Sequence, residues 1–195
     1  MKKLLILPII ISIIIGCTKE RILEPNELND LENNIDLAYV KQNFQNRVDA
    51  VFKYPYTSLY YEDLGYNQFE FKEANPFPVL ASKCFNGDLK VKMTDLGQEI
   101  ATYKIASTQD EVDQCITKRA NEPMDDHAIS VFSSSPVYEK YKDNPQFRNH
   151  LNSYKSDGVI TIGEYMSLYR DLHEIRKTET APVPKVLQQN ESLDK

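Results

Sequence analysis

Helix-start signals recur through the second half of the chain and constrain its fold more than any other feature. Thr108 with Glu111, and Thr161 with Glu164, have the spacing of a capping box, which satisfies backbone N–H groups at a helix start. Proline is also favoured in the first helical turn after a polar residue. Three such pairs are Glu122 with Pro123, Ser135 with Pro136 and Asn144 with Pro145. We therefore expect a mainly α fold whose helices begin at these places.

The region after residue 26 predicts a long helix. Apolar residues recur at steps of three and four from Leu28 to Phe52, with Asn26 as the N-cap and no Gly or Pro before Pro55. We expect one helix over 26–53. A last helix opens at Thr161, and its apolar face has the same spacing: Tyr165, Leu168, Tyr169, Leu172 and Ile175.

A small β-hairpin is expected between residues 84 and 106, which adds α+β as a second fold class. Asn86-Gly87 and Leu96-Gly97 are turn signals, and apolar and polar residues alternate over 89–94. The 195 residues suit a single globular domain, which we place at 26–177. Residues 178–195 contain two prolines and no aromatic residue, and we expect a disordered tail there.

The N-terminus has the pattern of an export signal. Lys2 and Lys3 precede an apolar run from Leu4 to Ile15. This run is shorter than the roughly 20 residues that a membrane-spanning helix needs, and it is typical of a signal peptide. We expect residues 1–16 to be removed on export.

The end of this run resembles the lipobox of bacterial lipoproteins, in the residues Ile14-Ile15-Gly16-Cys17. The resemblance implies cleavage after Gly16 and acylation of Cys17, with residues 17–25 as a lipidated tether. Thr18, where Asp would favour retention in the inner membrane, implies the periplasmic face of the outer membrane. In a Gram-positive host the same anchor implies the outer face of the plasma membrane.

The net negative charge of the chain argues against a nucleic-acid partner. Of the 23 basic residues, Lys2 and Lys3 leave with the signal, so 21 remain against 29 acidic ones and the net charge becomes −8. Nucleic acids and anionic lipids both require clustered basic residues. We expect no nucleic-acid partner, and membrane contact through the lipid alone.

Two cysteines remain after Cys17. Cys84 and Cys115 form an even pair in an exported chain, which favours a disulfide. Two buried free thiols are the alternative. Neither residue lies in a Cys-x-x-Cys motif, so a redox site is not expected.

Aromatic residues are dense over 52–80. Tyr and Phe are common at protein interfaces, so this segment is a candidate partner surface. The alternative is that the rings close the core around irregular turns. The candidate residues for partner binding are Tyr54, Tyr56, Tyr60, Tyr61 and Tyr66.

Residues 157–164 resemble the second half of an EF-hand loop, with Gly158 at the sharp turn and Asp157 and Glu164 as candidate Ca²⁺ ligands. Ser153 and Lys155 depart from the ligand pattern of the first half, and the sequence shows no second loop to pair with this one. Three readings stay open. They are a plain helix–turn–helix capped by Thr161 and Glu164, an EF-hand-like shape without metal, and a Ca²⁺ site.

Catalytic motifs are missing from the sequence. It contains no HExxH, GxSxG, Gly-rich phosphate loop or zinc-ligand spacing, and His127, His150 and His173 fall on three different expected helices. We expect no enzyme and no cofactor. The favoured function is a lipid-anchored envelope protein that binds a protein partner, as an inhibitor or immunity protein against an envelope-targeting toxin does. The alternatives are a structural or assembly lipoprotein of an envelope complex and a weak calcium-responsive module.

Overall fold

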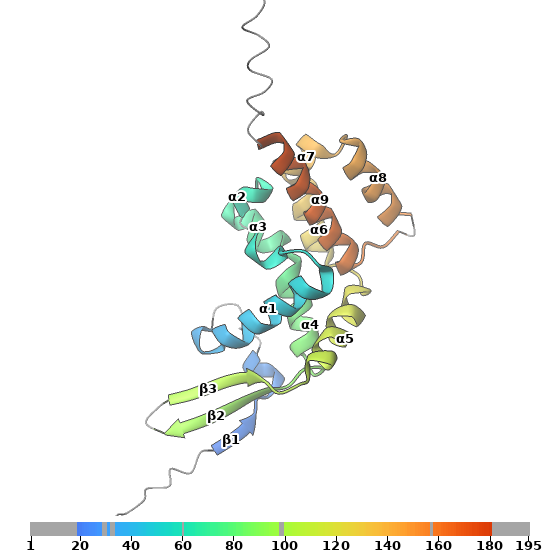
Figure 1. Cartoon of the computed structure of the whole chain (residues 1–195). Helices are drawn as coiled ribbons and strands as arrows, with labels where there is room; N and C mark the ends of the chain where they lie inside the picture. The colour runs from blue at the N-terminus through green and yellow to red at the C-terminus, as the bar shows by residue number, and fades with distance from the viewer. Residues whose placement is uncertain are drawn as a thin grey trace, which may run out of the picture.

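A small antiparallel sheet lies at one end of the molecule and a stack of helices at the other (Figure 1). The structure is a computed structural model that describes residues 19–28, 31, 34–59, 61–97, 100–156 and 158–180. The sheet consists of β1 (Lys19–Ile22), β2 (Val91–Gly97) and β3 (Ile100–Ile105). The α-helices are α1 (Ala38–Phe52), α2 (Tyr61–Leu64), α3 (Gln68–Ala74), α4 (Pro76–Phe85), α5 (Gln109–Ala120), α6 (Asp126–Ser134), α7 (Pro136–Tyr141), α8 (Pro145–Tyr154) and α9 (Ile162–Thr180). Three short 3-10 helices are η1 (Pro25–Leu28), η2 (Ile35–Leu37) and η3 (Tyr56–Ser58). The mainly α fold with a small hairpin is confirmed.

Most of the expected helix starts are confirmed. Both capping boxes form: Thr108 caps α5, and Thr161 exchanges hydrogen bonds with Glu164 at the start of α9. Pro136 and Pro145 begin α7 and α8, behind the N-caps Ser135 and Asn144. The prediction for Pro123 was wrong: α6 begins at Asp126, because the Asp125 side chain accepts a hydrogen bond from the N–H of Ala128.

The predicted helix over 26–53 was also wrong over residues 26–37. The segment contains η1 and η2, and only α1 is α-helical. Asn34 interrupts the pattern, because its side chain accepts from the N–H of Asp36 and caps η2. The periodicity holds within α1, whose buried residues are Val40, Phe44 and Val48.

The hairpin gains a third strand that the sequence did not predict. Residues 19–22 were expected in a tether, but β1 pairs with the outer edge of β2, with Lys19 opposite Asp95 and Ile22 opposite Lys92. Lys92 also forms an ion pair with Glu20 at 2.8 Å. The folded domain therefore includes residues 19–22, which lie before its predicted start at residue 26. At the other end α9 continues to Thr180, past the predicted boundary at 177, while residues 1–18 and 181–195 lie outside the described residues.

The core is centred on α9, which packs against α2, α4, α5 and α8. The expected apolar face of α9 is buried. Tyr165 and Tyr169 both donate hydrogen bonds to the carbonyl oxygen of Ala74, at 2.9 and 2.7 Å. These bonds satisfy two buried phenols and an end carbonyl of α3. Burial raises the pKa of both phenols well above the usual value for tyrosine.

A disulfide joins the end of α4 to the middle of α5. Cys84 and Cys115 are bonded, with their Cα atoms 5.8 Å apart, and both side chains are buried. The predicted pairing is confirmed over the alternative of two free thiols. Alongside it, Lys83 and Arg119 both contact the Glu122 carboxylate, which adds charge pairing to the junction between these helices.

Removal of the disulfide is expected to lower the free energy of unfolding by about 3–4 kcal/mol, because a closed loop of this length restricts the unfolded chain. The sequence separation is 31 residues. The measurement is urea denaturation, followed by circular dichroism, of the wild type and of C84A/C115A. Reductant should lower the unfolding midpoint of the wild type and leave that of the double variant unchanged. An unchanged midpoint in wild-type protein shown by thiol titration to be reduced would contradict the prediction.

Candidate functional site

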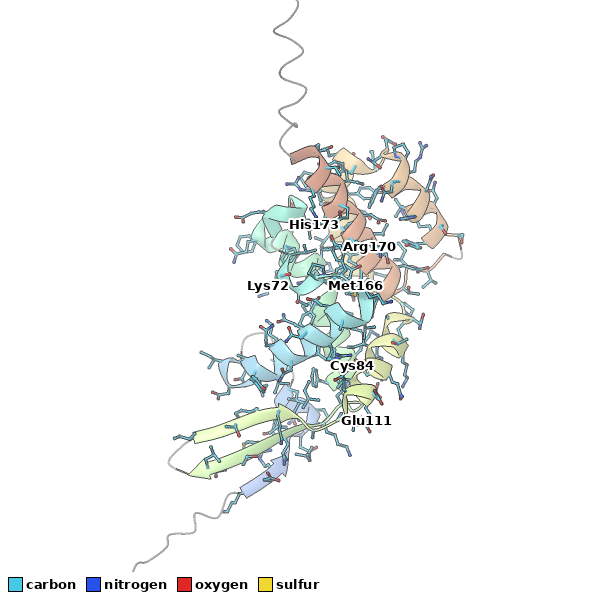
Figure 2. The ribbon with its side chains drawn as sticks, in the orientation of Figure 1. Lys72, Cys84, Glu111, Met166, Arg170 and His173 are labelled. Carbon is cyan, nitrogen blue, oxygen red and sulfur yellow. A yellow bond between two sulfur atoms is a disulfide. The ribbon has the colours of Figure 1, made fainter. Side chains whose placement is uncertain are left out.

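Tyrosine, histidine and charged side chains converge where the turn after α1 meets α8 and α9. Figure 2 shows two of them, Arg170 and His173, on α9 in the helical part of the molecule, away from the sheet. Most of these side chains are partly exposed, while one carboxylate is buried. We call this group the Tyr–His cluster. Its members are Tyr54, Tyr56, His150, Tyr154, Arg170, Asp171, His173 and Glu174.

Local structure places the two tyrosines. α1 ends at Phe52, and its C-cap Lys53 has a left-handed φ of 53° that turns the chain sharply. Asp49 then holds the following turn, because its carboxylate accepts hydrogen bonds from the N–H and the hydroxyl of Thr57 at 3.1 and 2.7 Å. Tyr54 and Tyr56, between these two fixed points, are thereby directed toward α9.

Tyr54 connects the turn to α9 through hydrogen bonds. Its hydroxyl donates to Oε1 of Glu174 at 3.0 Å and also lies against Nδ1 of His173. A phenol carries one proton. Because the Tyr54 hydroxyl donates that proton to Glu174, its oxygen accepts the hydrogen bond from the Nδ1–H of His173. Burial, followed by the hydrogen bond to Glu174, raises the pKa of Tyr54 well above its usual value.

His150 and Asp171 form the second pair of the cluster. Asp171 is only 3% exposed, and its Oδ2 lies 2.5 Å from Nδ1 of His150. Arg170 lies near the other carboxylate oxygen, at 3.8 Å. A buried carboxylate on Nδ1 fixes the orientation of an imidazole and leaves Nε2 to contact another molecule. His150 is well suited to that role, because 43% of its side chain is exposed.

The aromatic rings of the cluster contact one another. The ring centroids of Tyr54 and Tyr56 are 4.8 Å apart, and those of His150 and Tyr154 are 6.0 Å apart. Burial raises the pKa of Tyr56 to about 12; Arg170 opposes this shift and the charge of Asp171 adds to it. The cluster can therefore present neutral phenols, imidazoles and one guanidinium to a bound molecule.

The tyrosines predicted to bind a partner lie in different parts of the structure. Tyr54 and Tyr56 lie in the cluster. Tyr66 does not, because it is 4% exposed and stacks on Tyr169 in the core, so its prediction as a partner contact was wrong. Tyr60 and the side chain of Tyr61 lie outside the described residues. For Tyr66 the alternative holds, in which aromatic rings close the core.

Sequence reasoning missed the α8 and α9 members of the cluster. His150 and Asp171 are 21 positions apart and meet only because α8 packs on α9. One signal was present in the sequence. Asp171 precedes Leu172 on the apolar face of the last helix, where a carboxylate requires a hydrogen-bonding partner.

The EF-hand-like segment has a partner loop, contrary to the expectation of an unpaired one. The N–H of Met124 donates to the carbonyl of Ile160 at 2.8 Å, and that of Ile162 donates to the carbonyl of Glu122 at 2.9 Å. The loop between α5 and α6 thus pairs with the loop between α8 and α9. This pairing fits an EF-hand-like shape and the cap formed by Thr161 and Glu164 fits a plain helix–turn–helix, so all three alternatives remain predictions.

A metal role for this segment stays a prediction. The Glu164 carboxylate accepts hydrogen bonds from the N–H and hydroxyl of Thr161, at 2.8 and 2.9 Å, so it caps α9. The other candidate ligand, Asp157, lies outside the described residues. Among the side chains that the structure describes, no three or more His, Cys, Asp or Glu residues are grouped so that they could hold a metal ion.

Comparisons with family models, with curated proteins and with solved structures found no match for this chain. Within the described ranges, no helix has the length and apolar character needed to cross a membrane.

Loss of His150 is expected to destabilise the fold. H150A leaves the buried carboxylate of Asp171 without its short hydrogen bond, which should lower the free energy of unfolding by about 1–3 kcal/mol. The matched control is H127A, because His127 is 70% exposed and lies 3.6 Å from an exposed Glu73. That control should stay within about 0.5 kcal/mol of the wild type in urea denaturation at pH 7. Equal stability of the two variants would show that the pair does not support α8 on α9.

Proposed function

We propose that this chain is a lipid-anchored cell-envelope protein that binds a protein partner through the Tyr–His cluster. The observation that carries the proposal is the cluster itself, in which hydrogen bonds hold the partly exposed Tyr54, His150 and His173, while Arg170 lies 3.8 Å from the Asp171 carboxylate. The lipobox-like residues before Cys17 support the envelope location. No cofactor or catalytic step is part of the proposal.

The composition of the cluster suits recognition of a protein. Tyr and Arg are the residue types that most often dominate binding energy at interfaces. They are most effective when they are already ordered, because binding then costs little side-chain entropy. Tyr54 is fixed by Glu174, and His150 by Asp171, at 3.0 and 2.5 Å. A partner would therefore meet a surface that is arranged before it binds.

The position of the cluster also favours this role. β1 begins at Lys19, two residues after Cys17, whereas the cluster lies in the helical part (Figure 1). An anchor at Cys17 would hold the sheet end at the membrane, and the cluster would then face away from it. This arrangement suits an inhibitor or immunity protein that meets a toxin in the periplasm. An assembly lipoprotein would use the same surface for a component of an envelope complex.

Anchoring depends on the thiol of Cys17. We expect wild-type protein expressed with its own leader in a bacterial host to take up an alkyne-labelled fatty acid and to stay in the membrane fraction. C17S should take up no label and leave that fraction. The matched control K19S, two residues downstream, should behave as the wild type. Equal labelling of wild type and C17S would contradict the lipobox assignment.

Partner contact can be tested by site-specific photocrosslinking of the full chain in its native host. A benzophenone amino acid in place of Tyr154 should give one discrete crosslinked adduct, because this half-exposed ring borders His150 in the cluster. The same substitution at Phe69 on α3, which is 80% exposed, is the matched control and should give none.

Mass spectrometry of the adduct then decides between the two roles. A secreted toxin favours the immunity role, and a membrane-assembly component favours the structural one. Adducts of equal yield at both positions, or none at Tyr154, would rule out the cluster as the binding surface.

A further inference from the structure

Exposed apolar side chains gather at the end of the molecule that carries the sheet. Leu96 and Ile100 flank the β2–β3 turn and are 52% and 55% exposed. Ile35 in η2 and Tyr39 in the first turn of α1, four positions apart, are 86% and 65% exposed. Tyr39 shares a shallow hollow with residues 101–104 of β3, so the start of α1 and the hairpin are neighbours. We call these four side chains the apolar end.

This end lies beside the lipid attachment point. Lys19 is paired with Asp95, immediately before Leu96. Cys17 precedes Lys19 by two residues, and two extended residues span at most about 7 Å. Because β1 is part of the sheet, Thr18 is the only residue between Cys17 and the folded domain. A domain held this closely cannot move far from the bilayer that holds its acyl chains.

We propose that the apolar end docks on the phospholipid bilayer in which Cys17 is anchored. The proposal rests on the lipid anchor of the proposed function and adds a second, non-covalent contact. Leu96, Ile100 and Ile35 would transfer apolar surface from water to the headgroup boundary, and tyrosine is favoured at that depth.

Docking would give the domain one orientation. A domain held by a single lipid on a flexible tether can turn freely relative to the membrane. A domain held by a lipid and by an apolar surface beside it keeps one orientation relative to the membrane plane. The helical part, which carries Arg170 and His173 of the Tyr–His cluster away from the sheet (Figure 2), would then extend from the membrane. The net charge of −8 would not oppose docking on zwitterionic lipid, because the contact depends on apolar area instead of charge attraction.

The experiment uses tryptophan fluorescence, because the sequence contains no tryptophan. I100W introduces a single reporter at the apolar end, and F69W introduces one at an exposed position on α3 in the helical part. Both are prepared as full-length lipidated protein in vesicles of the zwitterionic lipids phosphatidylethanolamine and phosphatidylcholine. Flotation of the wild type with these vesicles establishes the anchor separately. Vesicles containing lipids brominated near the headgroup then quench a reporter that contacts the bilayer.

We expect I100W to show blue-shifted emission that brominated lipid quenches, and F69W to show neither change. Flotation with equal quenching of the two reporters overturns the docking while the anchor stands. A blue shift at I100W that brominated lipid leaves unquenched and dilution reverses indicates a second copy of the chain, and also overturns it. Failure of the wild type to float overturns the anchor, and the docking with it.

Discussion

The two buried phenols of α9 organise the helical part of this protein. Tyr165 and Tyr169 donate to the same carbonyl of Ala74, which joins the end of α3 to α9 at the centre of the core. A buried phenol without a partner would destabilise the fold by about 1–3 kcal/mol, so these bonds fix where α9 lies. With α9 fixed in this way, Asp171 reaches His150 of α8 and His173 reaches Tyr54 of the turn after α1.

Local chemistry determined what could be predicted of this fold. The capping boxes at Thr108 and Thr161 succeed because each is complete within four residues and depends on nothing distant. Pro123 fails as a helix start because Asp125 is a stronger competing cap nearby. The helix predicted from residue 26 fails for the same reason at Asn34. The spacing of apolar residues indicates which side of a helix is buried. Short polar side chains that cap a helix determine where it begins.

Tertiary contacts determined what could not be predicted. β1 has no buried residue, so its four side chains carry no strand pattern, and it exists because β2 offers an unpaired edge. The Tyr–His cluster is similar. Tyr54 and Tyr56 could be predicted as candidates because they lie in an aromatic-rich segment. His150 and Asp171 could not, because they come into contact only when α8 packs on α9. Tyr66 looked equivalent to Tyr54 in sequence, and only its stacking on Tyr169 separates the two.

The helices α1, α4 and α5 connect the two ends of the molecule. The ring of Phe44 on α1 packs against Phe85 of α4 at 5.1 Å, and Arg47 pairs with Asp113 of α5. The disulfide joins α4 to α5, while α1 also packs on β3 and α5 also packs on α9. Each contact is modest alone, but together they link the described sheet to α9 through α1, α4 and α5. An orientation imposed on the sheet would therefore be transmitted to the Tyr–His cluster, which is the mechanical property that an anchored binding protein needs.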